Sequence, residues 1–290
     1  MILRTNIAKI LHLTAHTRLL SFALLCFIYW PGTVESQIAL PSQPQGTILV
    51  HTAKGSEDLE GYLSVDLPGN TVANSWDSQT PTPAFWTSAR QAFSRSDSQA
   101  QAAINNARRH FKTPGLGEFI KRDLTVSPGG EFALDASVYT EGDIVDLRNG
   151  RGFSIRQLTD SLPYGPMFVA RASWSPDGKK LAVAGFHLNG RPQTLIEIDL
   201  DSGRILSSTR FDKPIESMCY DSHSDNIAVI TYTSRIPLGW LWQFFGGHGT
   251  TYYDYYLVIY ASRTPAAITS ETLLVKDAGH GARTVWLERR

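Results

Sequence analysis

Short apolar or alternating runs, each closed by a turn, follow one another along most of the chain. The clearest block is residues 172–211, where LAVAG is a short apolar run and TLIEIDL alternates between apolar and polar positions. Pro-Asp-Gly and Asp-Ser-Gly stand between the runs, and both favour tight turns because Pro fixes φ and Gly accepts a positive φ. The pattern predicts four antiparallel strands, at residues 169–175, 180–186, 194–199 and 205–211.

The same pattern recurs along the sequence. Two Ser-Pro-x-Gly turns begin at Ser127 and Ser175, 48 residues apart. The related segments IVDLRNG and EIDLDSG place Asp146 and Asp199 53 residues apart, and a worn third copy follows at residues 218–231. A period of about 45–50 residues with strand–turn–strand content is typical of propeller blades.

The segment WSPDGKKLAVAG…LIEIDLDSG (residues 174–203) resembles the WD40-like, TolB-type β-propeller repeat. The resemblance is good over this block, moderate over residues 120–160 and weak over 214–275. It implies a propeller and no particular reaction, since such repeats occur in exported bacterial proteins, in assembly scaffolds and beside the catalytic domain of some peptidases. The sequence lacks the G-x-S-x-G elbow that such a hydrolase domain would carry.

The two ends of the chain fit the same scheme. Strands are expected at residues 46–53, 61–67 and 71–76, and one more at residues 282–289. Pairing of the last strand with the first three would close a ring and remove two sheet edges. The predicted fold is therefore all-β: a small propeller of about four to five blades in residues 37–290.

Residues 83–112 interrupt the strand pattern. Phe85, Ala89 and Phe93 share one helical face, and Ser96 or Asp97 would suit the start of a second helix. We expect two short helices here, as a helical insertion or as a degenerate blade that carries helix.

The first 36 residues have the composition of an export signal. Arg4, Lys9 and Arg18 precede an uncharged run at residues 19–30, which is shorter than the roughly 20 residues that span a membrane. Cleavage before Gln37 would give an exported, periplasmic or secreted protein. The alternative is an uncleaved anchor at residues 19–30, in which case the protein would contact the membrane.

Charge adds little to this picture. The chain has 27 basic and 27 acidic residues and 42% hydrophobic residues, which is ordinary globular composition and gives no indication of nucleic-acid binding. After signal cleavage Cys219 would stand alone, and its apolar neighbours favour a buried, unreactive thiol.

An aromatic segment is the strongest candidate for binding. Residues 239–256 read GWLWQFFGGHGTTYYDYY, in which eight of eighteen residues are aromatic. Its tyrosines belong to an expected strand, whereas the preceding part is an excess that the repeat does not require. A hairpin insertion at residues 236–254 would present an aromatic surface to a partner, or would fold back over the propeller. The candidate binding residues are Trp240, Trp242, Phe244, Phe245 and His248.

Other residues that could bind metal or take part in catalysis are interpreted as loop or structural residues. His51, His223, His248 and His280 have no metal-ligand spacing, so no metal and no cofactor is expected. GGHG (246–249) and AGHGAR (278–283) suggest flexible loop tips. Asp66, Asp146 and Asp199 recur in equivalent positions, which favours structural hydrogen bonding over catalysis.

The favoured hypothesis is a non-enzymatic, exported β-propeller that binds a protein or an envelope glycan through its loop-bearing face. One alternative is a lactonase- or glycosidase-like hydrolase with its site in the propeller funnel. The other is a membrane-anchored interfacial protein whose Trp-rich loop enters the headgroup zone.

Overall fold

The computed structural model describes residues 44–54, 59–69, 71–74, 83–110, 125–135, 142–187, 190–236, 251–262, 267–268 and 271–287. The proposed signal or anchor at residues 1–36 and most of the aromatic hairpin lie outside these ranges. Gln43–Arg290 form one compact unit.

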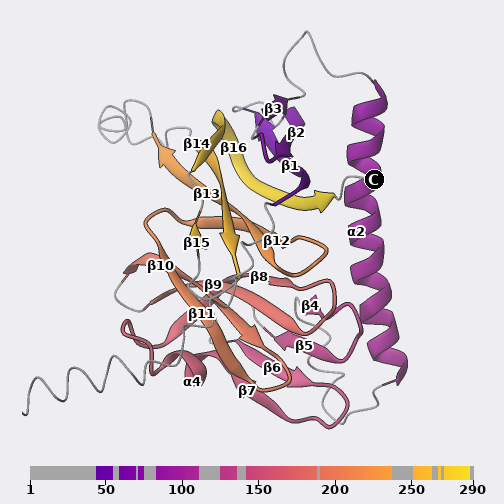
Figure 1. Cartoon of the computed structure of the whole chain (residues 1–290), viewed down its shortest axis with the longest axis vertical. Helices are drawn as coiled ribbons and strands as arrows, with labels where there is room; N and C mark the ends of the chain where they lie inside the picture. Colours follow the sequence, from indigo (N-terminus) through magenta and orange to yellow (C-terminus); the bar gives the residue numbers. More distant parts are fainter. Residues whose placement is uncertain are drawn as a thin grey trace, which may run out of the picture. The chain divides into compact units, whose positions relative to one another are not determined.

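The middle of the sequence forms two four-stranded antiparallel sheets (Figure 1). The first comprises β4 (Thr125–Val126), β5 (Phe132–Asp135), β6 (Asp143–Asp146) and β7 (Gly152–Ser154). The second comprises β8 (Met167–Trp174), β9 (Lys180–His187), β10 (Gly190–Asp199) and β11 (Arg204–Phe211). A short helix, α4 (Ile155–Thr159), lies between them in the chain. The four strands predicted in residues 169–211 are confirmed.

The remaining strands described form one eight-stranded sheet, in the order β12-β13-β14-β16-β1-β2-β3 with β15 paired to β14. Its strands from the second half of the chain are β12 (Ile215–Tyr220), β13 (Asn226–Arg235), β14 (Tyr252–Ala261), β15 (Ala267–Ile268) and β16 (Thr272–Leu287). Those from the first half are β1 (Gly46–Lys54), β2 (Leu59–Leu67) and β3 (Thr71–Asn74).

Strand β16 joins the two ends of the chain. Ala278 is in register with Tyr253 of β14 on one side and with Lys54 of β1 on the other. The part of β16 before Ala278 pairs with β14, and the part after it pairs with β1 as far as Leu287. The predicted pairing of the C-terminal strand with the N-terminal strands is therefore confirmed.

The same turn connects the first and second strands of three successive strand groups, β4 to β5, β8 to β9 and β12 to β13. The backbone N–H of Ser127, Ser175 and Asp221 donates to the carbonyl of Phe132, Lys180 and Asn226 respectively, at 2.9–3.0 Å. The third copy of the repeat therefore keeps the turn geometry of the first two, although its sequence has diverged from theirs.

Apolar side chains fill the space between successive strand groups. Ile144 and Leu181 belong to a cluster shared by β4–β7 and β8–β11, and Leu195 and Tyr260 to one shared by β8–β11 and β12–β14. A third cluster joins β13 and β14 to β1 and β2. Each fully buried aliphatic side chain contributes about 1.5–3 kcal/mol, so these layers are the main source of stability.

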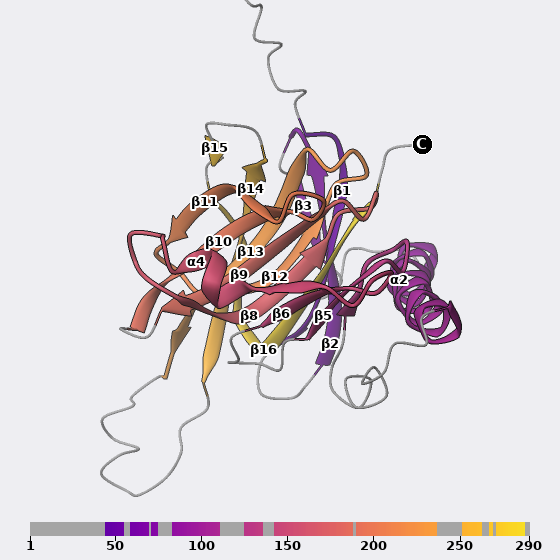
Figure 2. The same ribbon diagram turned by 90° about the horizontal axis from the view of Figure 1, so that it is seen from below.

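The chain from Pro83 to His110 forms one 28-residue helix, α2, and the prediction of two short helices is wrong. In the polar stretch at its middle, the Ser98 hydroxyl donates to the Ser94 carbonyl at 2.8 Å, so this hydroxyl is satisfied within the helix. The helix packs through Ala89, Ala92 and Phe93 on β1 and β2. Figures 1 and 2 both place α2 along one side of the strands. No helix in the described ranges is long and apolar enough to cross a membrane.

Candidate functional site

A cavity of about 480 Å³ lies where β8, β12 and β16 meet the end of β1. β8 and β12 are each the first strand of a strand group. Its chemically active lining residues are Arg171 from β8, Glu216 from β12, His280 and Arg283 from β16, and His51 from β1. The cavity therefore collects side chains from four strands that are far apart in the sequence.

Arg171 and Glu216 form the fixed polar pair of this cavity. The Arg171 Nε–H donates to the Glu216 carbonyl at 2.6 Å, and Nη2 donates to Glu216 Oε1 at 3.1 Å. Nη1 donates to the Ala170 carbonyl at 2.9 Å. Glu216 is only 7% exposed, and a buried carboxylate needs a partner of opposite charge, which this guanidinium supplies. The three bonds use three of the five N–H groups of Arg171.

His280 connects the cavity to the base of the aromatic hairpin. Its ring meets Tyr253 edge-on at 5.2 Å, and Tyr253 lies 5.4 Å from Tyr232 and 6.2 Å from Tyr255. The interpretation of AGHGAR as a loop tip is wrong, because His280 lies inside β16. Gly281, with φ +92°, lies where the register of β16 with β1 shifts. A β-carbon at this position would meet no atom within 4 Å, so the positive φ is the reason that glycine suits it.

The candidate binding residues of the aromatic segment are not described by the structure. Trp240, Trp242, Phe244, Phe245 and His248 all lie in residues 237–250. The described part of the hairpin is its stem, where β13 and β14 stay in register as far as Arg235 and Tyr252. The tyrosines of β14 are strand residues, as predicted, and Tyr255 is fully buried.

The other histidines are scattered. His51 and His280 both line the cavity, whereas His223 is exposed in the turn between β12 and β13. His187, which the sequence did not bring forward, is buried, with Nε2 at 2.9 Å from Thr194 Oγ1 and Nδ1 at 3.0 Å from the Gly165 carbonyl. Within the described ranges no group of three or more His, Cys, Asp or Glu side chains could hold a metal ion.

The recurrent aspartates lie away from the cavity and hold turns and strands. Asp146 accepts bonds from the Arg148 backbone and guanidinium at 2.9–3.0 Å, and Arg148 holds the pKa of that carboxyl below its ordinary value. Asp199 accepts the Ser202 N–H at 2.7 Å, which likewise lowers the pKa of Asp199. Asp66 accepts the Thr47 hydroxyl at 2.6 Å across β1 and β2. These bonds agree with the structural role that their recurrence indicates.

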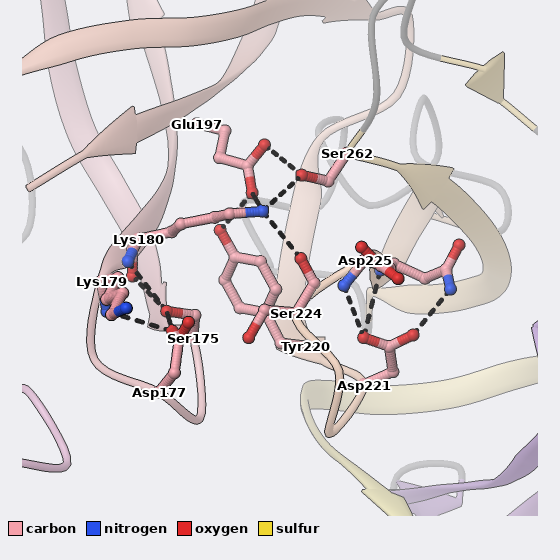
Figure 3. A network of polar contacts seen from close by, with 11 residues as sticks. Ser175, Asp177, Lys179, Lys180, Glu197, Tyr220, Asp221, Ser224, Asp225 and Ser262 are labelled. Carbon is pink, nitrogen blue, oxygen red and sulfur yellow. Dashed lines mark hydrogen bonds and ion pairs between the residues drawn. The ribbon is translucent and has the colours of Figure 1, made fainter. Parts of the chain in front are cut away.

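A second polar cluster joins β9 and β10 to β12 and the end of β14 (Figure 3). The fully buried Glu197 accepts the Tyr220 hydroxyl at 3.0 Å and the Ser262 hydroxyl, and lies 3.6 Å from Lys180 Nζ. Burial and the neighbouring Glu197 carboxylate raise the pKa of Tyr220 well above its ordinary value. The Glu197 carboxylate is engaged by other side chains of the protein, so this cluster holds two strand groups together.

Cys219 has the environment of a structural thiol. Its Sγ lies 3.5 Å from Thr284 Oγ1 of β16, and burial raises the pKa of the thiol to about 12. A protonated thiol is a poor nucleophile at neutral pH, in agreement with the unreactive role expected from its apolar neighbours.

No sequence motif points to Arg171 and Glu216, which are 45 residues apart. The available signal was a charged residue inside each of two apolar strand patterns, MFVARASW and IESMCY. A buried charge in such a pattern needs a partner, but the pattern does not say which partner.

No protein-family model and no curated protein matches the sequence. Among solved structures, hydrazine synthase of Kuenenia stuttgartiensis is 19% identical with a TM-score of 0.35, over 50% of this chain and 40% of that chain. TolB from Acinetobacter baumannii is 13% identical with a TM-score of 0.34, over 84% of this chain and 67% of that one. The β-propeller domain of the trilobed protease from Pyrococcus furiosus is 14% identical with a TM-score of 0.32, over 79% and 56%.

The chain spans 40% of the length of the first of these proteins, and likenesses this distant add nothing to the assignment. The class of the protein rests on its own strand pairing. Repeated antiparallel strand groups, the last of which is extended through β16 to the N-terminal strands, define an all-β fold of the propeller type.

Proposed function

We propose that this protein is a non-enzymatic β-propeller scaffold, exported to the cell envelope, that captures a partner through the face bearing the aromatic hairpin. The observation that carries the proposal is the position of His280, which lines the cavity and also contacts Tyr253 in the hairpin stem. The hairpin and the cavity would therefore act as one binding face. Aromatic side chains supply large contact areas at such interfaces.

The lining of the cavity favours binding over hydrolysis. Glycoside hydrolysis needs two carboxyl groups at a set separation. Among the described residues that line the cavity, Glu216 is the one carboxylate, and Arg171 already engages it. A site that holds a partner needs only complementary charge and contact area, which this cavity and the hairpin stem supply.

The test compares capture from envelope extract by the wild-type protein and by Trp240→Ala/Trp242→Ala. We expect the double variant to fold normally by circular dichroism and to lose the captured species. Tyr164→Ala, which truncates an aromatic residue 44% exposed next to β8, is the matched control and should retain it. Equal capture by the wild type and the double variant would refute the hairpin as the binding element, and turnover in a hydrolase screen would refute the non-enzymatic role.

The exported location is tested separately. The N-terminal sequence of the secreted or periplasmic protein should begin at Gln37. A protein that keeps residues 1–36 and sediments with membranes would instead support the anchored alternative.

A further inference from the structure

A second cleft, of about 620 Å³, lies between α2 and the sheet formed by β16, β1 and β2. One wall is the cross-strand row of Arg283, His51 and Tyr62, which are in register with one another. The other wall is a polar stripe of α2 that includes Ser94, Asp97, Ser98 and Gln101, spaced three or four residues apart. The helix thus packs on the sheet at Phe93 and leaves a polar cleft beside this contact.

The formal charge of this cleft is positive. Its charged lining residues are Arg90, Arg283 and Asp97, which leaves an excess of one positive charge. Arg283 also lines the first cavity, where Arg171 and Glu216 offset each other. A cleft with excess guanidinium charge favours an anionic ligand.

Arg283 is oriented for a carboxylate. Its guanidinium lies over the Phe93 ring, 5.7 Å from the centroid, and two of its nitrogens face the two oxygens of Asp97. This is the paired geometry in which Arg holds carboxylates. Arg283 and Asp97 are both 57% exposed, and exposed ion pairs contribute little to stability. Another carboxylate can therefore replace Asp97 at small cost.

We propose that this cleft binds a carboxylate group carried by an acidic peptide segment, with Arg283 as its anchor and Arg90 as the second cation. The rings of His51, Tyr62 and Phe93, whose centroids lie 4.8–5.8 Å apart and whose planes are tilted to one another, form the apolar floor of the cleft beside Arg283. This inference deepens the proposed scaffold function and rests on it, because it gives the chemical class of a protein partner.

Calorimetric titration with a tri-glutamate peptide tests the proposal. Arg283→Gln should weaken binding about tenfold, because the bidentate charged contact is lost. Asp97→Asn should strengthen it about threefold, because the internal competitor for Arg283 is removed. The matched control is Arg210→Gln, which changes another exposed Arg that lies over an aromatic ring, Tyr164, on β11. It should leave the affinity unchanged.

Four results would overturn the proposal. Tri-glutamine binding as tightly as tri-glutamate would show that charge is not recognised, and unchanged affinity in Arg283→Gln would exclude the anchor. Succinate binding as tightly as the peptide would assign the cleft to small dicarboxylates instead. Trp240→Ala/Trp242→Ala separates this proposal from the scaffold function. Retained peptide binding by that variant supports the cleft even if partner capture proves independent of the hairpin, and lost binding would move the peptide to the hairpin.

Discussion

At the scale of single residues, three equivalent turns keep the same backbone conformation although their sequences differ. Gly130 and Gly178 occupy the fourth position of the first two turns with φ of 75° and 69°, and Ser224 occupies it in the third with φ 60°. Their backbone N–H groups donate to Ser127, Ser175 and Asp221 respectively. The left-handed conformation costs a non-glycine residue about 1–2 kcal/mol, so Ser224 is a point of local strain.

Ser224→Gly is therefore expected to stabilise the protein. Glycine removes the left-handed penalty, but it also gains conformational freedom in the unfolded chain, so the net gain is about 0.5–1 kcal/mol. Urea denaturation measures the difference.

The reverse change, Gly178→Ser, is the matched control. A β-carbon at Gly178 would meet nothing closer than 3.7 Å, so the loss of about 1 kcal/mol that we expect comes from φ alone. If both variants shift the unfolding free energy in the same direction, backbone conformation does not distinguish these turns.

At the scale of elements, the contact between strand groups combines apolar packing with one buried polar network. Glu197 lies among apolar neighbours on β10, and its carboxylate is satisfied by Lys180 from β9 and by Tyr220 and Ser262 from the next group (Figure 3). Lys180 extends the network, since its Nζ donates to the Ser224 carbonyl at 2.9 Å. A buried network of this kind aligns two strand groups only while every member is satisfied.

Glu197→Gln should lower the free energy of unfolding by about 3 kcal/mol, because Lys180 loses its counter-ion and the two hydroxyls lose a charged acceptor. Replacing both charges, in Lys180→Met/Glu197→Gln, should cost less than Glu197→Gln alone, because no unpaired charge remains and the glutamine oxygen can still accept from a hydroxyl. Urea titration of the three proteins gives the comparison. A double variant less stable than the single one would show that the network contributes net stability beyond the pairing of its charges.

Sequence pattern predicted the elements where local signals agreed. Residues 167–211 combine β-branched runs with Pro-Asp-Gly and Asp-Ser-Gly turns, and their strands match the structure. It failed where side chains override a local signal. Ser96 and Asp97 suit a helix start, yet α2 continues through them, and the glycines around His280 suit a loop, yet they lie in β16.

At the scale of the whole molecule, the candidate site could not be predicted from the sequence. The cavity depends on Arg171 of β8, Glu216 of β12 and His280 of β16, and only the packing of two sheets brings these three strands together. Strand β16 is central to that arrangement, since it supplies His280 and Arg283, pairs with β1 and covers Cys219. The same strand therefore determines both the stability of the fold and the integrity of the site.

Truncation tests this dependence. Deleting residues 282–290 removes every β16 partner of Thr47 to Thr52 in β1, together with the packing of Ala282, Val285 and Leu287. We expect a loss of about 4 kcal/mol or more, seen as a fall in Tm of about 10 °C or more. The Cys219 thiol, freed from Thr284, should also react faster with a thiol reagent. Deleting only residues 288–290 removes none of these pairs and should change neither measurement. If the longer deletion leaves both unchanged, contacts other than β16 hold the N-terminal strands, and the cavity does not depend on joining the chain ends.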